Sequence, residues 1–244
     1  MKNFKISSLI TILLIAMLAL VGCGKEEAKP ASPSTEVAAI KEMAGTELVD
    51  KNGDKTKDSF LLIDVRSEEE YLAGHVPHAI NIFIDELEAN LAIIEDYKEK
   101  TVVLICNSGN KSGQAAEILV NNGFKDVYNA EGVKKFEYEL VHYKDVRGAQ
   151  FEEIIKDTAN VVIVDVREAK QATSEGMIAG AINVPFSEVS AHLDQLPKDK
   201  TIALYCNTGT KSATVAKELE ALGYTNIVNS IEGVKEYAFS NIKK

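Results

Sequence analysis

The sequence predicts an α/β protein of two tandem domains, each a small parallel sheet flanked by helices. Two observations predict this fold class. The 244-residue chain repeats itself at offsets of 100 to 102 residues, and each half alternates short apolar runs with amphipathic stretches. A repeat of this length indicates a duplicated domain. The alternation is typical of parallel strands covered by helices.

Four pairs of matching segments carry the repeat. They are Leu61–Arg66 with Val162–Arg167, Ala79–Ile82 with Ala181–Val184, Cys106–Ser112 with Cys206–Ser212, and Glu131–Lys134 with Glu232–Lys235. The repeat divides the folded part of the chain into a first domain, 41–140, and a second domain, 141–244.

The N-terminal segment has the layout of an export signal. Lys2 and Lys5 precede an apolar run over 9–21, which is shorter than the roughly 20 residues that a bilayer span needs. The run ends in Leu-Val-Gly-Cys, which resembles the bacterial lipobox. We therefore expect a lipoprotein signal peptide over 1–22, with an uncleaved anchor or simple secretion as alternatives.

A lipobox predicts where the protein is held. Cys23 would carry the lipid, such as palmitate, and 23–40 would contain this cysteine and a flexible tether rich in Lys, Glu, Ala, Pro and Ser. The expected location is extracytoplasmic, with the membrane as a partner through a lipid anchor on the bacterial cell membrane.

Continuous apolar runs mark the strands of each half, because strands buried on both faces lack polar alternation. In the first half we expect strands at 60–65, 101–106 and 126–129. Helices are expected at 85–96 and 112–121, the latter stopped by Gly123, and a short one from about Gly132. In the second half we expect strands at 161–166 and 202–206, and a helix from 212 to about 222 that Gly223 stops.

Composition narrows the class of function. The formal net charge is -10, with 37 acidic and 27 basic residues, which argues against a nucleic-acid partner. Three cysteines are too few for a disulfide framework, so each needs its own explanation.

The two remaining cysteines lie in matching loops between a strand and a helix. Backbone N–H groups of such a loop and the start of the helix favour a thiolate. Gly109 and Gly209 permit a tight turn, and Lys111 and Lys211 add positive charge for an anionic substrate. A small buried hydrophobe is the alternative for a lone cysteine, but two matching loops favour reactive cysteines at Cys106 and Cys206.

The rest of each loop is expected to bind substrate. These residues are Asn107, Ser108, Gly109, Asn110, Lys111 and Ser112 in the first half, and Asn207, Thr208, Gly209, Thr210, Lys211 and Ser212 in the second.

Other charged residues near these loops favour structural roles. Asp64 with Arg66, and Asp165 with Arg167, follow buried strands, where charged pairs hold loops in place. His75 and His78 have no third ligand at metal-binding spacing, and the second half lacks both, so hydrogen-bonding roles are expected. The run 68–70 of three glutamates is expected to form the first turn of a helix. We expect no metal and no cofactor.

Taken together, these motifs resemble a tandem rhodanese, a sulfurtransferase. Asp-Val-Arg, Glu70-Tyr71, Gly74–Pro77, Ala79–Ile82, the cysteine loop and Glu-Gly-Val follow the order of that family over about 46–244. The resemblance implies that the loop cysteine takes sulfur from a small sulfur-containing anion, such as thiosulfate or a polysulfide. It would become a persulfide and pass the sulfur to a thiol or other thiophilic acceptor.

The resemblance has departures that bear on substrate. A six-residue loop from Cys106 to Lys111 implies sulfur substrates, whereas rhodanese-like phosphatases have a longer loop. Both loops end in lysine where the family usually has arginine, so the planar two-pronged grip on an oxyanion is lost. The second half has Gly176-Met177 in place of Gly74-His75. A non-catalytic binding or scaffold lipoprotein, and a thiol redox protein pairing Cys106 with Cys206, remain alternative functions.

Overall fold

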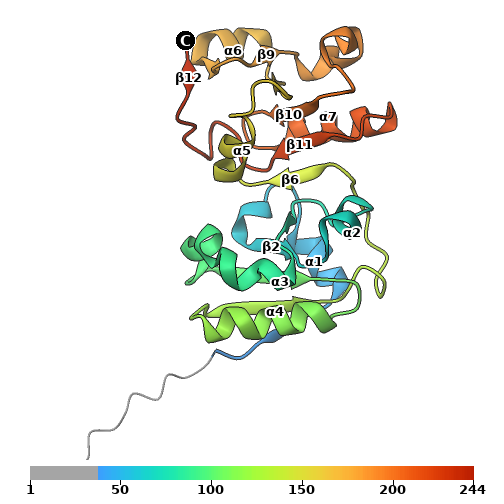
Figure 1. Ribbon diagram of the computed structural model, residues 1–244, viewed down its shortest axis with the longest axis vertical. Coiled ribbons are helices and arrows are strands. Elements are labelled where there is room, and N and C mark those ends of the chain that lie inside the picture. Colours follow the sequence, from blue (N-terminus) through green and yellow to red (C-terminus); the bar gives the residue numbers. More distant parts are fainter. Residues whose placement is uncertain (1–37) are drawn as a thin grey trace, which may run out of the picture. The chain divides into compact units, whose positions relative to one another are not determined.

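The protein is described by a computed structural model that covers residues 38–244 (Figure 1). The predicted signal peptide and Cys23 lie outside the described residues. Residues 38–244 belong to one compact unit. Within this range, no helix combines the length and the apolar character that crossing a bilayer requires.

A five-stranded parallel sheet forms the centre of the first domain. Its strands follow the spatial order β1 (Lys41–Met43), β5 (Asp126–Ala130), β4 (Thr101–Ile105), β2 (Leu61–Asp64) and β3 (Ile80–Asn81). The cysteine-bearing β4 lies in the middle, between β5 and β2.

The second domain repeats this arrangement. Its parallel sheet has the order β6 (Lys144–Val146), β11 (Ile227–Ser230), β10 (Thr201–Tyr205), β7 (Val161–Asp165) and β9 (Ile182–Asn183). A separate antiparallel pair joins β8 (Met177–Ile178) to β12 (Ile242–Lys243). The predicted fold class, two tandem domains with small parallel sheets flanked by helices, is confirmed.

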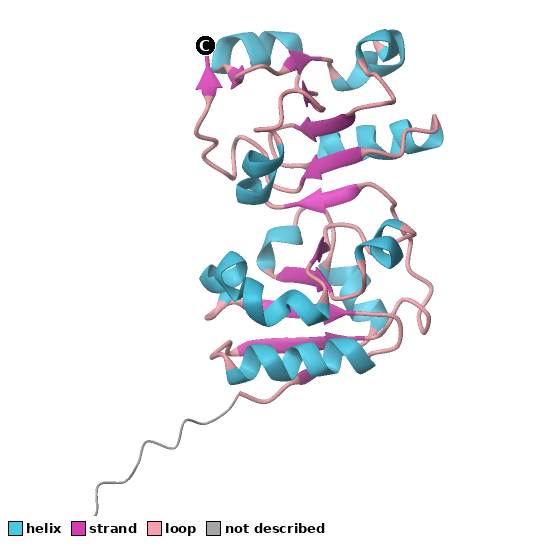
Figure 2. Cartoon of the chain, viewed as in Figure 1, coloured by secondary structure: helices cyan, strands magenta, loops and turns pink. Residues whose placement is uncertain are grey.

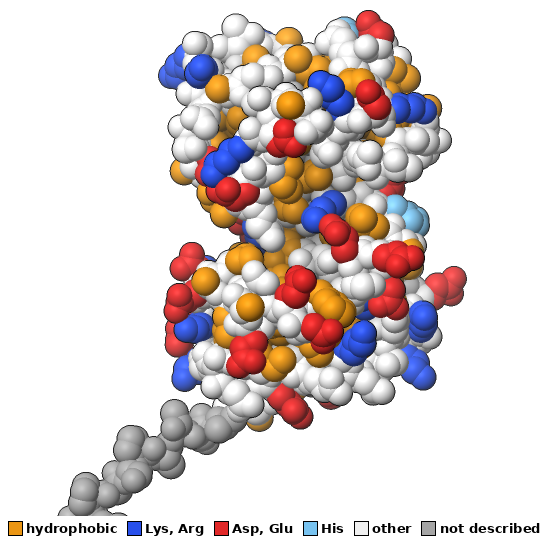
Figure 3. Space-filling model, in the orientation of Figure 1, with side chains coloured by type: hydrophobic (Ala, Val, Ile, Leu, Met, Phe, Trp, Pro, Cys, Tyr) orange, Lys and Arg blue, Asp and Glu red, His pale blue; other side chains and the backbone are white. Residues whose placement is uncertain are grey.

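Helices flank both sheets (Figure 2). The first domain contains α1 (Gly45–Lys51), α2 (Glu68–Leu72), α3 (Ile84–Leu87) and α4 (Asn110–Asn121), with 3-10 segments η1 (Lys57–Ser59) and η2 (Glu88–Tyr97). The second domain contains α5 (Gly148–Ile154), α6 (Ala169–Glu175) and α7 (Thr210–Ala221), with η3 (Phe186–Ala191) and η4 (Leu193–Gln195). On the face seen in Figure 3, acidic and basic side chains are interspersed.

The central strand β4 is buried on both faces, as its continuous apolar sequence predicts. Val102 and Leu104 join one apolar cluster, and Val103 and Ile105 join another. Successive side chains of a strand point to opposite faces, so helices on both sides of the sheet are needed to cover them.

The structure corrects the expected helix from about Gly132, which is a turn. The N–H groups of Lys135 and Phe136 both donate to the Gly132 carbonyl oxygen, which closes one turn. Tyr138 then donates to the Phe136 carbonyl oxygen, so no further bond from residue i+4 to residue i continues the helix. Within the helix expected at 85–96, only α3 is α-helical and η2 is 3-10, because a short apolar pattern does not separate a period of 3.6 from one of 3.0. The strands β1, β3, β6 and β9 were not predicted, because two or three residues show no periodicity.

We predict that Leu104→Ala lowers the free energy of unfolding by about 2–5 kcal/mol, because Leu104 is fully buried and its truncation leaves a cavity. Chemical denaturation measures this change. Val49→Ala is the matched control, since Val49 is 51% exposed and its truncation should cost less than about 0.5 kcal/mol. Equal losses for both variants would contradict the assignment of β4 to the core.

Candidate active site

Each candidate cysteine lies directly after the central strand of its sheet. Cys106 follows β4 and precedes α4, and Cys206 follows β10 and precedes α7. The chain turns sharply at Gly109 (φ 92°) and Gly209 (φ 73°), the left-handed residues that begin the two helices. A residue with a side chain would be strained there, which accounts for glycine in both loops.

The Cys106 sulfur is surrounded by hydrogen-bond donors. Its Sγ lies 3.3 Å from the N–H nitrogen of Gly109, 3.4 Å from that of Ser112 and 3.3 Å from the Ser112 hydroxyl oxygen. Burial raises the pKa of the Cys106 thiol, but the Ser112 hydroxyl and the backbone N–H groups of Ser108, Ser112 and Gly109 together outweigh burial and lower the pKa. The first loop can therefore stabilise a thiolate or an anionic persulfide.

The Ser112 hydroxyl has one proton and two acceptors within reach, Sγ of Cys106 and Oδ1 of Asn129, so it donates to one of them at a time. Its oxygen lies 2.7 Å from Oδ1 of Asn129, and Nδ2 of Asn129 lies 3.2 Å and 3.3 Å from the carboxylate oxygens of Glu42. Because a carboxylate can only accept from the amide, Glu42 fixes which end of Asn129 faces Ser112. The sequence did not reveal Asn129 or Glu42, because their contact joins residues that are 87 positions apart. In the second sheet Asn229 occupies the position of Asn129, pairing with Leu204 as Asn129 pairs with Leu104, and it donates to Asp145 at 2.7 Å.

The Cys206 loop is less well supplied with donors, although its sequence matches. Within 38–244, Sγ of Cys206 has the Ser212 hydroxyl, at 3.6 Å, as its hydrogen-bond partner. That hydroxyl also lies 2.9 Å from the carbonyl oxygen of Gly209. Both sulfurs are buried, in residues that are 2% exposed.

The Glu-Gly-Val segment of each half packs against the backbone of the cysteine loop and forms hydrogen bonds with it. Val133 and Val234 donate N–H hydrogen bonds to the carbonyl oxygens of Cys106 and Cys206, at 2.9 Å and 3.0 Å. A Cβ atom on Gly132 would lie 2.4 Å from the Asn107 backbone, so only glycine fits. The repeat in the sequence marked this segment, but its contact with the cysteine loop became visible only in the structure.

Arg66 connects the strand end of β2 to the cysteine loop. Its guanidinium binds Asp64 through Nε and Nη2, donates to the Gly74 carbonyl oxygen at 2.7 Å, and lies 3.4 Å from Oδ1 of Asn107. In the second domain, Arg167 binds Asp165 and donates to the Gly176 carbonyl oxygen at 2.6 Å. The change from Gly74-His75 to Gly176-Met177 therefore preserves this contact.

The two sites differ in the side chain that bonds the first asparagine of the cysteine loop. Glu70 accepts a hydrogen bond from Asn107 at 2.7 Å, and this bond is the main reason why the pKa of Glu70 is lowered. The second domain has the neutral Gln171 against Asn207 at 3.0 Å. Thus the expected helix turn at 68–70 is present as the start of α2, but it also contributes a carboxylate to the first site.

The loop lysines lie at the exposed rim. Lys111 Nζ lies 5.5 Å from the ring centre of Phe83, and Lys211 Nζ lies 5.4 Å from that of Phe186. Lys211 is also 3.5 Å from the Glu168 carboxylate. Among the other loop residues, Ser108 and Asn110 are exposed, and Thr208 and Thr210 are half-buried.

The two histidines of the 74–78 segment are buried, and neither has a hydrogen bond to Cys106 within 38–244. The His75 ring stacks on Tyr71 with centres 3.6 Å apart, and burial lowers the pKa of His75 to about 3, so the ring is neutral. The His78 N–H donates to Asp145 at 2.7 Å, and its ring lies 3.4 Å from Asp54.

Comparison with known proteins decides the family. The rhodanese-like domain profile matches residues 45–137 and 148–239. The chain belongs to the rhodanese-like domain family.

Rhodanese-family relatives match single domains of this chain. The thiosulfate sulfurtransferase PspE of Escherichia coli (strain K12) is 46% identical over 72 residues, which cover 30% of this chain and 69% of that protein. The tRNA uridine(34) hydroxylase of Photorhabdus laumondii subsp. laumondii is 34% identical over 76 residues, which cover only 22% of that protein. A solved rhodanese with anions from E. coli is 41% identical and covers 34% of this chain and 96% of its own, with a TM-score of 0.32.

We predict that Ser112→Ala raises the pKa of the Cys106 thiol by about one pH unit, because the thiolate loses a hydrogen bond worth about 1.5 kcal/mol. The alkylation rate of Cys106 is followed by peptide mass spectrometry as a function of pH. At pH values below the thiol pKa, the variant should react more slowly than the unmodified protein, and at high pH the two rates should be equal. Ser108→Ala is the control, because Ser108 acts through its backbone and should leave the profile unchanged. Coincident profiles for Ser112→Ala and the unmodified protein would contradict this account.

Proposed function

We propose that the protein is a sulfurtransferase that carries sulfane sulfur on a loop cysteine, with Cys106 as the principal carrier. The observation that carries this proposal is the set of donors around the Cys106 sulfur, three of which lie within 3.4 Å. Such donors stabilise both the attacking thiolate and the negative charge of a persulfide. Membership of the rhodanese-like family supports the same chemistry.

The proposed reaction has two steps. In the first, the Cys106 thiolate attacks the outer sulfur of thiosulfate, a new S–S bond forms, the old S–S bond breaks, and sulfite leaves with the electron pair. In the second, an acceptor thiolate attacks the outer sulfur of the Cys106 persulfide, and the Cys106 thiolate leaves. The electrons balance without a cofactor.

The donor is proposed to be a small sulfur-containing anion, thiosulfate or polysulfide. Lys111 is exposed at the rim and supplies positive charge there, and one relative carries the name thiosulfate sulfurtransferase. We further propose that Cys23 is lipidated, so that the reaction takes place outside the cytoplasm at the membrane.

Sulfur loading tests the proposed function. The full chain and its Cys106→Ser and Cys206→Ser variants are incubated with thiosulfate or polysulfide, and peptide mass spectrometry is used to find a gain of one sulfur atom. We expect loading on Cys106 to be faster than on Cys206. No loading on either cysteine with any sulfane donor would favour a binding or scaffold protein, and a Cys106–Cys206 disulfide in its place would favour thiol redox work.

We predict that Lys111→Ala slows loading of Cys106 from thiosulfate roughly fivefold, because an exposed charge contributes about 1 kcal/mol to anion binding. Lys111→Arg, which keeps the charge and adds a planar guanidinium, should load at least as fast as the unmodified protein. An unchanged loading rate in Lys111→Ala would show that Lys111 does not take part in binding the sulfur donor.

A further inference from the structure

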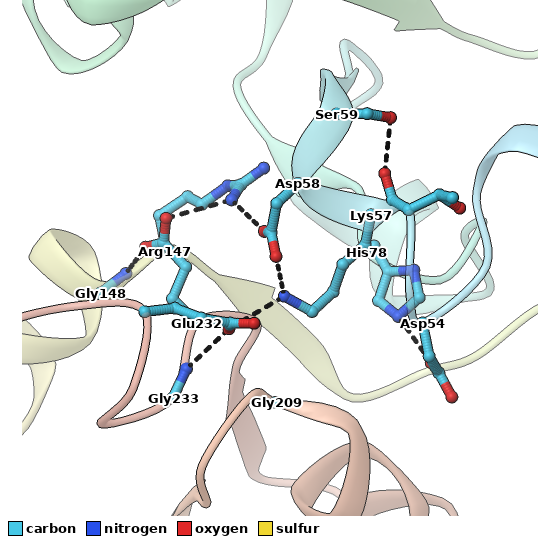
Figure 4. Close-up of polar contacts among 12 residues, drawn as sticks. Asp54, Lys57, Asp58, Ser59, His78, Arg147, Gly148, Gly209, Glu232 and Gly233 are labelled. Carbon is cyan, nitrogen blue, oxygen red and sulfur yellow. Dashed lines mark hydrogen bonds and ion pairs between the residues drawn. The ribbon is translucent and has the colours of Figure 1, made fainter.

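A buried lysine of the first domain reaches into the second domain. Lys57, in η1, has a side chain that is only 1% exposed. Its Nζ binds the neighbouring Asp58 (Figure 4). The same Nζ lies 3.1 Å from Oε2 of Glu236 in the second domain. A buried ammonium is stable only when carboxylates surround it, so these two partners are structurally required.

Asp58 extends this contact into a network. Its Oδ1 lies 3.0 Å from Nη1 of Arg147, and the same nitrogen lies 3.1 Å from Oε1 of Glu232. The other oxygen of Glu232 accepts the Gly148 N–H at 2.7 Å. The Lys57-Asp58 pair is thus connected to both acidic ends of the segment 232–236, to Glu236 through Lys57 and to Glu232 through Asp58 and Arg147.

The segment 232–236 supports the Cys206 loop directly. Its Gly233 N–H donates to Glu236 at 3.3 Å, and a Cβ atom on Gly233 would lie 2.0 Å from the carbonyl carbon of Asn207. Lys235 donates its N–H to the Asn207 carbonyl oxygen at 3.0 Å. Three steps therefore connect Lys57 to the cysteine loop, namely Glu236, the turn at Gly233 and the Asn207 backbone.

The matching segment of the first domain, 131–135, has no hydrogen bond or ion pair to the second domain within 38–244. This segment carries Lys135 where the second domain has Glu236. Glu131 accepts the Gly45 N–H at 3.0 Å, and both residues belong to the first domain. The two cysteine loops therefore differ in what holds them, although their sequences match.

We propose that Lys57 is a positioning residue for Cys206, so that the second site takes its working geometry from the first domain. The hydrogen-bond donors around Cys106 come from its own loop. Cys206 has fewer donors, so its geometry depends more on the contacts of its loop with the segment 232–236. Sulfur chemistry at Cys206 then depends on Lys57 of the first domain, whereas chemistry at Cys106 does not depend on Lys57. This inference rests on the proposed function only for its activity readout.

The test uses Lys57→Met in the full chain and reads both sites in one molecule. Hydrogen exchange of the segment 232–236 should become roughly tenfold faster, while exchange of 131–135 stays unchanged. Sulfur loading should fall roughly tenfold at Cys206 and remain the same at Cys106. Lys55→Met is the matched control, because Lys55 is an exposed neighbour and should change neither site.

A milder variant covers the case in which Lys57→Met unfolds. Glu236→Gln keeps the shape and removes the charge, so it should speed exchange of 232–236 in the same direction. The charge swap Lys57→Glu with Glu236→Lys should restore part of the protection. Unchanged exchange of 232–236 in the folded variant, or an equal rise in 131–135, would overturn the proposal. Because exchange needs no sulfur donor, it remains informative even if neither cysteine loads.

Discussion

The contact between a glycine and the backbone of the cysteine loop is the constraint on which both sites depend. Gly132 and Gly233 lie so close to Asn107 and Asn207 that no side chain fits between them. This contact allows the following N–H groups to bind the carbonyl oxygens at the strand ends. Each cysteine loop is therefore fixed by contacts with a segment some 25 residues further along the chain.

Around the two cysteine sulfurs, the halves have diverged in their hydrogen bonds and in their charged side chains. The first site has backbone donors directed at Sγ and a carboxylate, Glu70, at its rim. The second has the neutral Gln171, and its lysine is paired with Glu168. Duplication preserved the scaffold and the cysteine, while the polar groups that control reactivity changed. The segment that supports the Cys106 loop is bonded within its own domain, whereas the segment that supports the Cys206 loop is also bonded to Lys57 of the first domain.

The sequence predicted the features that repeat or are strongly apolar, and missed those that depend on distant contacts. The strands around β4 and β10, the cysteine loops and the glycine at the start of each helix all followed from pattern and repeat. Asn129, Glu42 and Lys57 could not be predicted, because each acts through a residue far away in the chain. The segment after Gly132 forms a single helical turn, and the sequence does not show that the turn ends there.

The central claim is that the loop makes the Cys106 thiol acidic, and a direct titration of the unmodified protein tests it. Alkylation of Cys106, resolved by peptide mass spectrometry, is measured from acidic to alkaline pH. We expect a midpoint below the ordinary thiol value of about 8.5. A midpoint at or above that value would contradict the claim, because burial would then outweigh the donors of the loop.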